Sequence, residues 1–200
     1  VYDPFLLRGL DGLIYGLYSE SKFIVVGTPS GVSLSPEGGA HQSTVTPGLG
    51  IGLPNLVSYE PAFAREVEWV LLAALRECLD RSKGRSTYLR LATKPIDQTL
   101  LDPVIDRLGE DELRRQVLAG GYRLIDGKLD APESDPEETV QIAVAGAMVP
   151  EAVAAAQALH KEGVSANVLA ITSADRLYAA LTAARRRDGS ADSEPAAQVA

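Results

Sequence analysis

The side chains best suited to chemistry lie on one segment, residues 28–43, which is rich in glycine, serine and proline. It follows an apolar run at 23–27 that is typical of a buried strand. A long loop at the end of such a strand is a common place for chemistry in α/β proteins. The segment holds His41, one of only two histidines in the chain. Because the reference pKa of histidine is about 6.5, a loop histidine can move a proton or stabilise a developing oxyanion at neutral pH.

Plainer interpretations of these residues stay open. His41 can be a surface loop residue, and Gly38 with Gly39 can supply the backbone freedom of a tight turn. A phosphate cradle is disfavoured, since neither Gly-x-x-x-x-Gly-Lys-Ser/Thr nor Gly-x-Gly-x-x-Gly occurs. The other histidine, His160, is expected to face solvent near the end of an alanine-rich helix. Cys78 is expected to be an inert thiol in an amphipathic helix, so a Cys-His nucleophile pair and a His/Cys metal site are both disfavoured.

Three short strands and two helices are expected to position the segment. Apolar residues recur at helical spacing over residues 4–20 and, more strongly, over 61–82. The glycine-rich stretch at 48–52 predicts mobility beside the loop. The three predicted strands are 23–27, 56–59 and 87–92.

The second half of the chain again alternates strands with helices. A weakly amphipathic helix is predicted at 102–118, followed by an edge strand at 122–125. The polar stretch at 126–138 contains proline and is typical of an exposed linker. A strand, a helix, a strand and a helix are then predicted at 140–145, 150–162, 167–172 and 174–187.

The alternation of strands and helices predicts parallel sheets joined by right-handed crossovers. Neither half completes a sheet, so the predicted fold is α/β with parts of two doubly wound parallel-sheet domains. The predicted divisions are 1–100 for the first domain, 101–138 for a linker and 139–188 for the second domain. Residues 189–200 are predicted to be a disordered tail.

The composition argues against several classes of protein. A formal net charge of −8 and a pI near 4.8 disfavour a nucleic-acid-binding or anionic-membrane surface. No apolar run approaches the ~18 residues that span a bilayer, and the N-terminus lacks the pattern of a signal peptide. A single cysteine excludes an internal disulfide and suits the reducing cytoplasm. The missing initiator methionine predicts that the chain is an internal piece of a longer protein.

The order of residues along the loop resembles the active-site loop of the transketolase-like thiamine-diphosphate enzymes. In that family a buried strand ends in a threonine, an acidic residue followed by glycine comes later, and a histidine-glutamine pair follows. Here the same order is Thr28, then Glu37 with Gly38, then His41 with Gln42.

Within the family, the sequence is most similar to the homodimeric type of the pyruvate dehydrogenase first component. The similar segments are YDPF, PEGGAHQ, EPAF and LRLATK, at residues 2–5, 36–42, 60–63 and 89–94. The resemblance covers residues 1–187. It implies part of a pyrimidine-binding domain followed by the start of a transketolase C-terminal-like domain.

The resemblance also implies roles for individual residues. Tyr2, or Phe5 in its place, matches the aromatic residue that packs on the aminopyrimidine of the cofactor. His41 matches the catalytic histidine that faces the substrate and the thiazolium carbon. Glu37 matches an acidic position that contacts donor hydroxyls in transketolases, although the family has aspartate there. Lys94 falls near an arginine that binds the substrate anion.

The rest of the implied active site lies outside this chain. Thiamine diphosphate and Mg²⁺ are the implied cofactors, and the ligands of the metal and of the diphosphate belong to another domain. The activating glutamate of the family is expected upstream of Val1, and the C-terminal domain is expected to continue beyond Ala200. The fragment alone is therefore expected to be inactive.

The implied partners are a second copy of the chain, because the cofactor of this family lies between two subunits, and a lipoyl-bearing acyltransferase. The implied reaction belongs to central carbon metabolism: pyruvate is decarboxylated and its acetyl unit is passed to a lipoyl group. Two alternatives remain open. One is a transketolase that moves a two-carbon ketol between sugar phosphates, and the other is a non-catalytic dimerisation or regulatory module.

Overall fold

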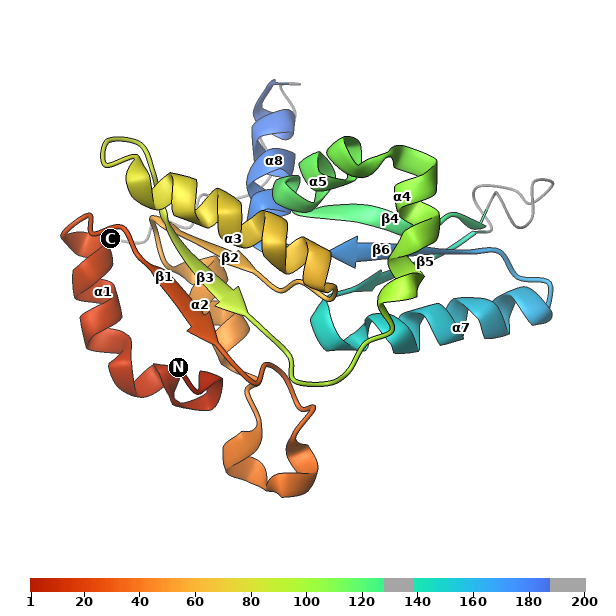
Figure 1. Ribbon diagram of the computed structural model, residues 1–200, viewed down its shortest axis with the longest axis horizontal. Coiled ribbons are helices and arrows are strands. Elements are labelled where there is room, and N and C mark those ends of the chain that lie inside the picture. Colours follow the sequence, from red (N-terminus) through yellow and green to blue (C-terminus); the bar gives the residue numbers. More distant parts are fainter. Residues whose placement is uncertain (128–138, 188–200) are drawn as a thin grey trace.

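The computed structural model describes residues 1–127 and 139–187, which form two three-stranded sheets lying side by side (Figure 1). The strands are β1 (Ile24–Gly27), β2 (Leu56–Tyr59), β3 (Ser86–Arg90), β4 (Gly121–Ile125), β5 (Val140–Val144) and β6 (Ala166–Ile171). The α-helices are α1 (Leu10–Tyr18), α2 (Thr46–Gly52), α3 (Ala64–Leu79), α4 (Asp102–Leu108), α5 (Glu110–Ala119), α7 (Val149–Lys161) and α8 (Ala174–Arg187).

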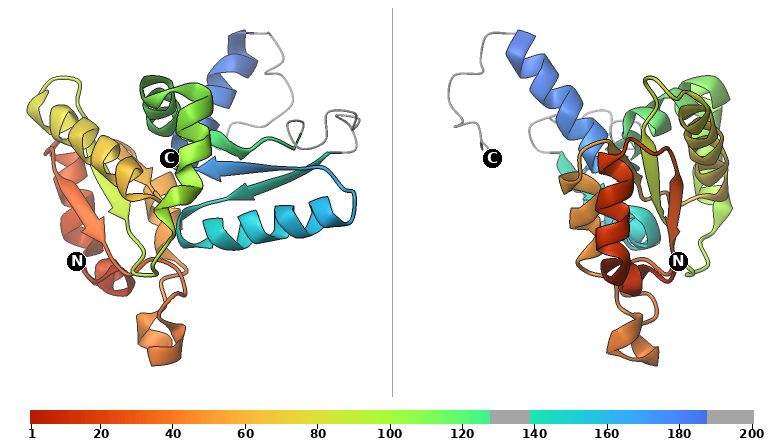
Figure 2. Two further views of the ribbon diagram at one scale, coloured as in Figure 1. Left: turned by 45° about the vertical axis from the view of Figure 1, so that its right-hand side comes forward. Right: turned by 90° about the vertical axis from the view of Figure 1, so that its left-hand side faces the viewer.

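The first sheet is parallel throughout, with β3 between β1 and β2. Helix α3 covers one face, while α1 and α2 lie on the other (Figure 2). Successive side chains along the strands point to opposite faces of the sheet. Leu56 and Tyr88 belong to a core with α1, whereas Val57 and Leu89 belong to a core with α3. Both faces are therefore apolar, and the predicted doubly wound α/β fold is confirmed.

The second sheet has the order β4-β6-β5. Strands β5 and β6 are parallel, as predicted, while β4 runs antiparallel to β6 along the edge of the sheet. An antiparallel edge strand on an otherwise parallel sheet is common. β4 lies inside the stretch that was predicted to be a linker, so part of that stretch extends the second sheet. The predicted domain divisions themselves stay predictions.

Several helices differ in extent from their predictions. The expected helix over 4–20 begins as a 3₁₀-helix at Asp3–Gly9 and becomes α1 afterwards. The expected helix over 102–118 is two helices, which are separated by Gly109 at a φ of 78°. The tail at 189–200 and residues 128–138 of the predicted linker lie outside the described residues.

Helix α2 was not predicted, because three of its residues are glycine and glycine disfavours helices. Its packing on the sheet explains the exception. A Cβ atom at Gly50 would overlap the side chain of Ser58 on β2. Close approach of the helix to the strand thus requires glycine at this position, and tertiary contact outweighs the intrinsic preference.

One apolar core joins the two sheets. It includes fully buried Phe63 and Val70 from the α3 region, Val117 from α5, and Val149 and Val168 from the second sheet and its helix. Burial of such side chains contributes about 1.5–3 kcal/mol each. The two sheets are therefore held together by core packing. Within the described ranges, no helix has the length and apolar character needed to cross a bilayer.

A buried carboxyl group, that of Glu66, lies between α3 and β4. Its Oε2 accepts hydrogen bonds from the backbone N–H groups of Ala62 (2.7 Å) and Phe63 (2.9 Å). Among the described residues, neither its Oε1 nor the Tyr122 hydroxyl has a hydrogen-bond partner at normal geometry, but the two groups lie close enough to interact with each other. Burial raises the pKa of Glu66, although the two backbone donors oppose the shift, and burial beside Glu66 raises the pKa of Tyr122.

We expect Glu66→Gln to remove a pH-dependent loss of stability. The folded-state pKa lies above the ordinary value of 4.5. The protonated acid therefore makes its full favourable contribution to folding stability at pH values below 4.5. It is lost as the pH rises through the folded-state pKa. Glutamine keeps an acceptor for both N–H groups and carries no charge, so the variant should be more stable than wild type at neutral pH. The advantage should shrink in acid.

Urea midpoints measured across pH check this expectation. Glu68→Gln, on the exposed side of the same helix, is the matched control and should track the wild type. A gap between wild type and Glu66→Gln that widens in acid would contradict the assignment.

Candidate functional site

The site is built at the carboxyl end of β1, where the first residues of the chain pair with this strand. The Val1 amino group donates to the carbonyl of Val26 (2.8 Å), and Thr28 N–H donates to the carbonyl of Val1 (3.1 Å). Asp3 N–H then donates to the carbonyl of Thr28 (3.1 Å). This short ladder fixes Tyr2 beside the point where β1 ends and the loop begins.

The loop at 28–43 closes on itself, since Ser43 N–H donates to the carbonyl of Gly31 (2.8 Å). Two 3₁₀ turns lie inside it, at Ser35–Glu37 and Gly39–His41. Gly38 joins them at a φ of 123° and a ψ of 169°, a conformation open essentially to glycine alone. The glycine thus permits the sharp turn that brings His41 back toward Tyr2.

Four of the five residues singled out from the sequence come together here. The Tyr2 hydroxyl is hydrogen-bonded to Nδ1 of His41, and the two rings meet edge to face with centroids 5.7 Å apart. The Phe5 ring lies 5.1 Å from that of Tyr2 and is 43% exposed. The Glu37 carboxylate lies 3.9 Å from Nδ1 of His41. The cluster is partly open to solvent, and its functional roles stay predictions.

The hydrogen bond to Tyr2 decides what His41 can do. With the Tyr2 hydroxyl as the donor, Nδ1 is the acceptor and the neutral ring carries its hydrogen on Nε2; with Nδ1–H as the donor, the two roles are reversed. No described residue bonds Nε2. In the first arrangement His41 presents an N–H donor at the loop surface, where it can bind an oxygen atom that gains negative charge.

Lys94 lies apart from this cluster. Its ammonium group pairs with Glu151 in the first turn of α7, and it lines a 460 Å³ cleft together with Phe63 and Gln98. The sequence placed Lys94 in the same site as His41. The structure shows no contact between Lys94 and the Tyr2 cluster.

Asp3 follows Tyr2 in the chain, and nothing in the sequence indicated its role. It is fully buried, and its Oδ1 accepts from the hydroxyl of Tyr88. Its Oδ2 accepts from the hydroxyls of Ser43 and Thr46, the latter at 2.6 Å. Arg90, 3% exposed, lies with Nε 3.8 Å from Oδ2. Three hydroxyl donors and one guanidinium thus compensate the burial of this charge.

We expect Gly27→Ala to destabilise the protein by about 1–3 kcal/mol, the usual cost of overpacking a core. A Cβ atom at Gly27 would overlap the Asp3 carboxylate and approach the Tyr88 ring at 3.0 Å. Gly12→Ala is the matched control: its Cβ would meet nothing within 4 Å, and it lies in α1. The control should stabilise the helix by up to about 1 kcal/mol. Thermal unfolding of both variants checks the expectation, which fails if they shift alike.

A third charge near the site, Glu60, is partly buried, with 27% of its side chain exposed. It follows β2, and its carboxylate pairs with Nη1 of Arg90. Burial raises the pKa of Glu60, while the Arg90 guanidinium opposes the shift and the Asp3 charge adds to it. Burial and the hydrogen bond to Asp3 raise the pKa of Tyr88. The sequence offered one signal for this network, a charged residue at position 90 inside an otherwise buried strand.

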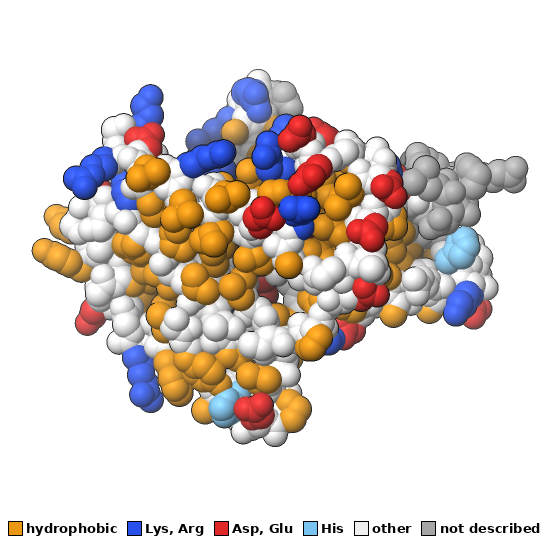
Figure 3. Space-filling view, viewed as in Figure 1, with side chains coloured by type: hydrophobic (Ala, Val, Ile, Leu, Met, Phe, Trp, Pro, Cys, Tyr) orange, Lys and Arg blue, Asp and Glu red, His pale blue; other side chains and the backbone are white. Residues whose placement is uncertain are grey.

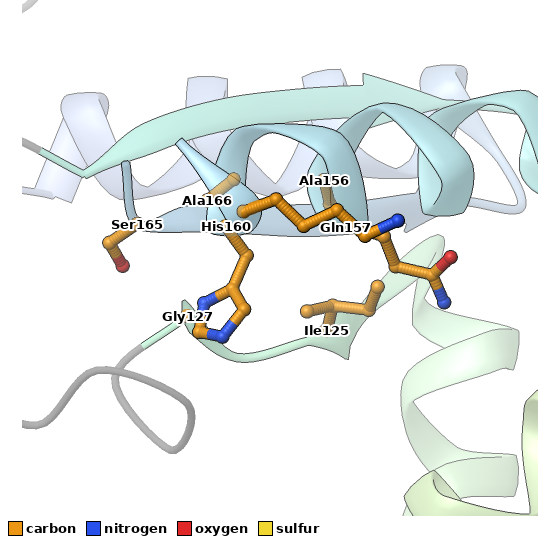
Figure 4. A pocket seen from close by; sticks show the side chains of 8 residues that line it. Ile125, Gly127, Ala156, Gln157, His160, Ser165 and Ala166 are labelled. Atoms are coloured by element: carbon orange, nitrogen blue, oxygen red, sulfur yellow. The ribbon is translucent and has the colours of Figure 1, made fainter. Parts of the chain in front are cut away.

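The second histidine lines a separate cavity of about 220 Å³ between α7 and the ends of β4 and β6 (Figure 4). Ile125, Ala156 and Ala166 supply apolar walls, and His160 lies at its rim in the last turn of α7. His160 is exposed, as predicted. This cavity shares no residue with the Tyr2 cluster.

Comparisons with known proteins point to one fold. No protein-family model and no curated protein matches the chain. A Pichia stipitis transketolase in complex with sedoheptulose-7-phosphate superposes with a TM-score of 0.67 and 20% identity over 88% of this chain. A Campylobacter jejuni transketolase gives 0.65 and 17% over 90%. The chain shares its fold with transketolases.

The shared region is only part of those enzymes. The chain spans 23% and 24% of the length of the two transketolase chains. A split-gene transketolase, described as an inactive beta4 tetramer, superposes with a TM-score of 0.55 and 20% identity, and the match covers 86% of this chain and 48% of that one. At such identities the likeness establishes the fold.

Proposed function

We propose that the chain is part of a thiamine-diphosphate-dependent enzyme and contributes one wall of its active site. The observation that carries the proposal is the Tyr2–His41 pair, placed at the carboxyl end of β1 in a transketolase-like fold. The carboxyl ends of parallel strands are where α/β enzymes bind ligands. The sequence resemblance of the loop and the geometry of the pair support the same site.

The aromatic residues of the cluster suit one part of the cofactor, its aminopyrimidine ring. Tyr2 and Phe5 form a half-open aromatic surface suited to packing on an aminopyrimidine ring. When bound, thiamine diphosphate supplies a thiazolium carbon that adds to a substrate carbonyl and takes up the electrons released there. In the described ranges, no group of three or more His, Cys, Asp or Glu side chains is arranged to hold a metal ion. Ligands for Mg²⁺ and the diphosphate are assigned to parts of the protein outside this chain.

His41 would act on the substrate. Its Nε2–H group can hydrogen-bond the oxygen of the bound 2-oxo group as negative charge gathers there, and the Tyr2 hydroxyl holds the ring in the required tautomer. Glu37, whose carboxylate lies 3.9 Å from Nδ1 of His41, is proposed to bind hydroxyl groups of the substrate. Lys94 is proposed to bind the anionic end of a substrate, although it lies on a separate cleft.

Decarboxylation of pyruvate with acetyl transfer to a lipoyl group is the reaction we propose, since the segments at 2–5, 36–42 and 60–63 resemble the pyruvate dehydrogenase first component. Transfer of a two-carbon ketol between sugar phosphates is the second candidate. It is favoured by the transketolase fold, and one of the matching transketolases was solved with sedoheptulose-7-phosphate.

A second copy of the chain is the proposed partner. Leu71, Leu72, Leu75 and Leu79 leave apolar surface exposed along α3, and Figure 3 shows apolar side chains gathered on this face. Exposed apolar patches of this kind mark protein contacts. A lipoyl-bearing acyltransferase is the further partner that the pyruvate reaction requires.

The test uses the full-length gene product with thiamine diphosphate and Mg²⁺. Pyruvate-dependent reduction of an artificial electron acceptor is compared with turnover of ketose phosphates. Activity on pyruvate supports the first candidate, and activity on sugar phosphates alone supports the second. No cofactor-dependent activity with either substrate would refute the enzyme assignment and favour the non-catalytic module.

A further inference from the structure

Two buried charges, Asp3 and Arg90, and the partly buried Glu60 connect the candidate site with the second sheet. Arg90 lies between two carboxylates: its Nη1 pairs with Glu60, and its Nε lies 3.8 Å from Oδ2 of Asp3. Its Nη2 donates to the backbone carbonyl of Ser43 (3.1 Å). One guanidinium thus binds the residue after β2, the first turn of the chain and the end of the His41 loop.

At the site end, Asp3 holds both parts of the cluster. It directly follows Tyr2 in the chain, and its Oδ2 accepts from Ser43 and Thr46, which close the loop that carries His41. Tyr2 and the loop are therefore placed by the same carboxylate. A shift of Asp3 relative to the sheet would change the distance between Tyr2 and His41.

At the other end, Glu60 touches the second sheet. Its backbone N–H donates to the carbonyl of Thr172, at the end of β6 (2.8 Å). Its side chain packs on Gly146 in the turn after β5, where φ is 51° and a Cβ atom would lie 2.9 Å from Cγ of Glu60. The position of this carboxylate thus depends on the carboxyl ends of β5 and β6.

Two glycines show how closely the Asp3 and Glu60 side chains pack against the neighbouring backbone. Gly27 leaves room for the Asp3 carboxylate, and Gly146 leaves room for that of Glu60. Separating a buried charge from its partner is costly, because the charge is then uncompensated in a medium of low dielectric constant. Movement at Gly146 should therefore be transmitted to Asp3.

We propose that Asp3, Arg90 and Glu60 form a positioning relay that makes the placement of His41 beside Tyr2 depend on how the second sheet packs on the first. The catalytic meaning of the relay rests on the proposed function, whereas its existence does not. The three residues are positioning residues, since they act on the site through the loop and through Tyr2.

The test follows His41 directly in the full-length protein by NMR. Histidine is labelled with ¹³C, the His41 signal is assigned by its loss in His41→Ala, and its ring contact with Tyr2 is recorded as a cross-peak. Glu60→Gln removes the charge and keeps the shape, and Gly146→Ala displaces Glu60 without changing any charge. Both are expected to shift the His41 signal and to abolish the cross-peak.

Glu77→Gln is the matched control, because it removes a carboxylate from a different ion pair that links α3 to α8, Glu77–Arg176 at 4.0 Å. It should leave His41 unchanged. An unmoved His41 signal in Glu60→Gln and Gly146→Ala overturns the relay, as does an equal shift in the control. Failure of Glu60→Gln to fold also counts against the relay, since a residue with a positioning role should not be required for the two sheets to fold. A His41 response without any cofactor-dependent activity would keep the relay and refute the proposed function.

Discussion

If the proposed function is correct, His41→Ala is expected to lower turnover of the full-length protein by about a hundredfold or more, the range typical for loss of a positioned proton donor or acceptor. Nδ1 of the imidazole is bonded to Tyr2, so Nε2 is the ring nitrogen that no described residue bonds and that can face a substrate. Alanine leaves the growing charge on the substrate oxygen without this donor. Steady-state kinetics with the substrate that the activity test selects will show the loss chiefly in kcat.

Tyr2→Phe is the informative companion to this variant. It keeps the aromatic ring and removes the hydroxyl that is hydrogen-bonded to Nδ1 of His41, so a smaller loss of turnover is expected. His160→Ala is the matched histidine control, because His160 lies on another cavity, and it should retain wild-type turnover. Wild-type activity in His41→Ala would exclude the proposed role of this residue.

Arg90→Met lowers the free energy of unfolding by about 3–5 kcal/mol, the usual cost of removing one partner from a buried charge pair. Methionine retains much of the volume but leaves the Asp3 and Glu60 carboxylates without their cation. Asp3 keeps three hydroxyl donors in this variant. Replacing its unpaired charge with a neutral side chain should therefore recover part of the lost stability. Chemical denaturation of Arg90→Met and of the Asp3→Asn/Arg90→Met double variant measures this recovery.

Arg65→Met provides the control for the loss of an arginine as such. Arg65 makes an exposed ion pair with Glu68 at 2.9 Å, and exposed pairs contribute about 0–1 kcal/mol. Its unfolding free energy should therefore stay within about 1 kcal/mol of wild type. Equal effects of the two substitutions would show that the Arg90 charge is not the cause.

The strands of the first sheet were predictable because their residues carry the apolar pattern of a sheet covered on both faces. The stretch at 56–59 became β2 with the predicted limits, and helix α8 was predicted residue for residue at 174–187. The spacing of apolar residues is a local property, so it can be detected in the sequence alone. The direction of β4 and the existence of α2 depend on which surfaces meet in space, and no local pattern reports those contacts.

The same distinction applies to the candidate site. The position of His41 on a glycine-rich loop after a strand was visible in the sequence, and the structure brings Tyr2, Phe5 and Glu37 to it. Asp3 was missed because an aspartate just before a predicted helix usually caps it or faces water. Its importance comes from hydroxyl groups that lie 40, 43 and 85 residues away along the chain.

The shared core of the two sheets has a consequence for the history of the chain. Phe63 and Val70 from the first half are buried together with Val117, Val149 and Val168 from the second. A gene divided between the sheets would produce two polypeptides that each expose this apolar surface. Exchange of the second half for an unrelated one would require a matching core as well as a matching turn beside Glu60. The two halves are therefore expected to have been inherited and altered as a unit.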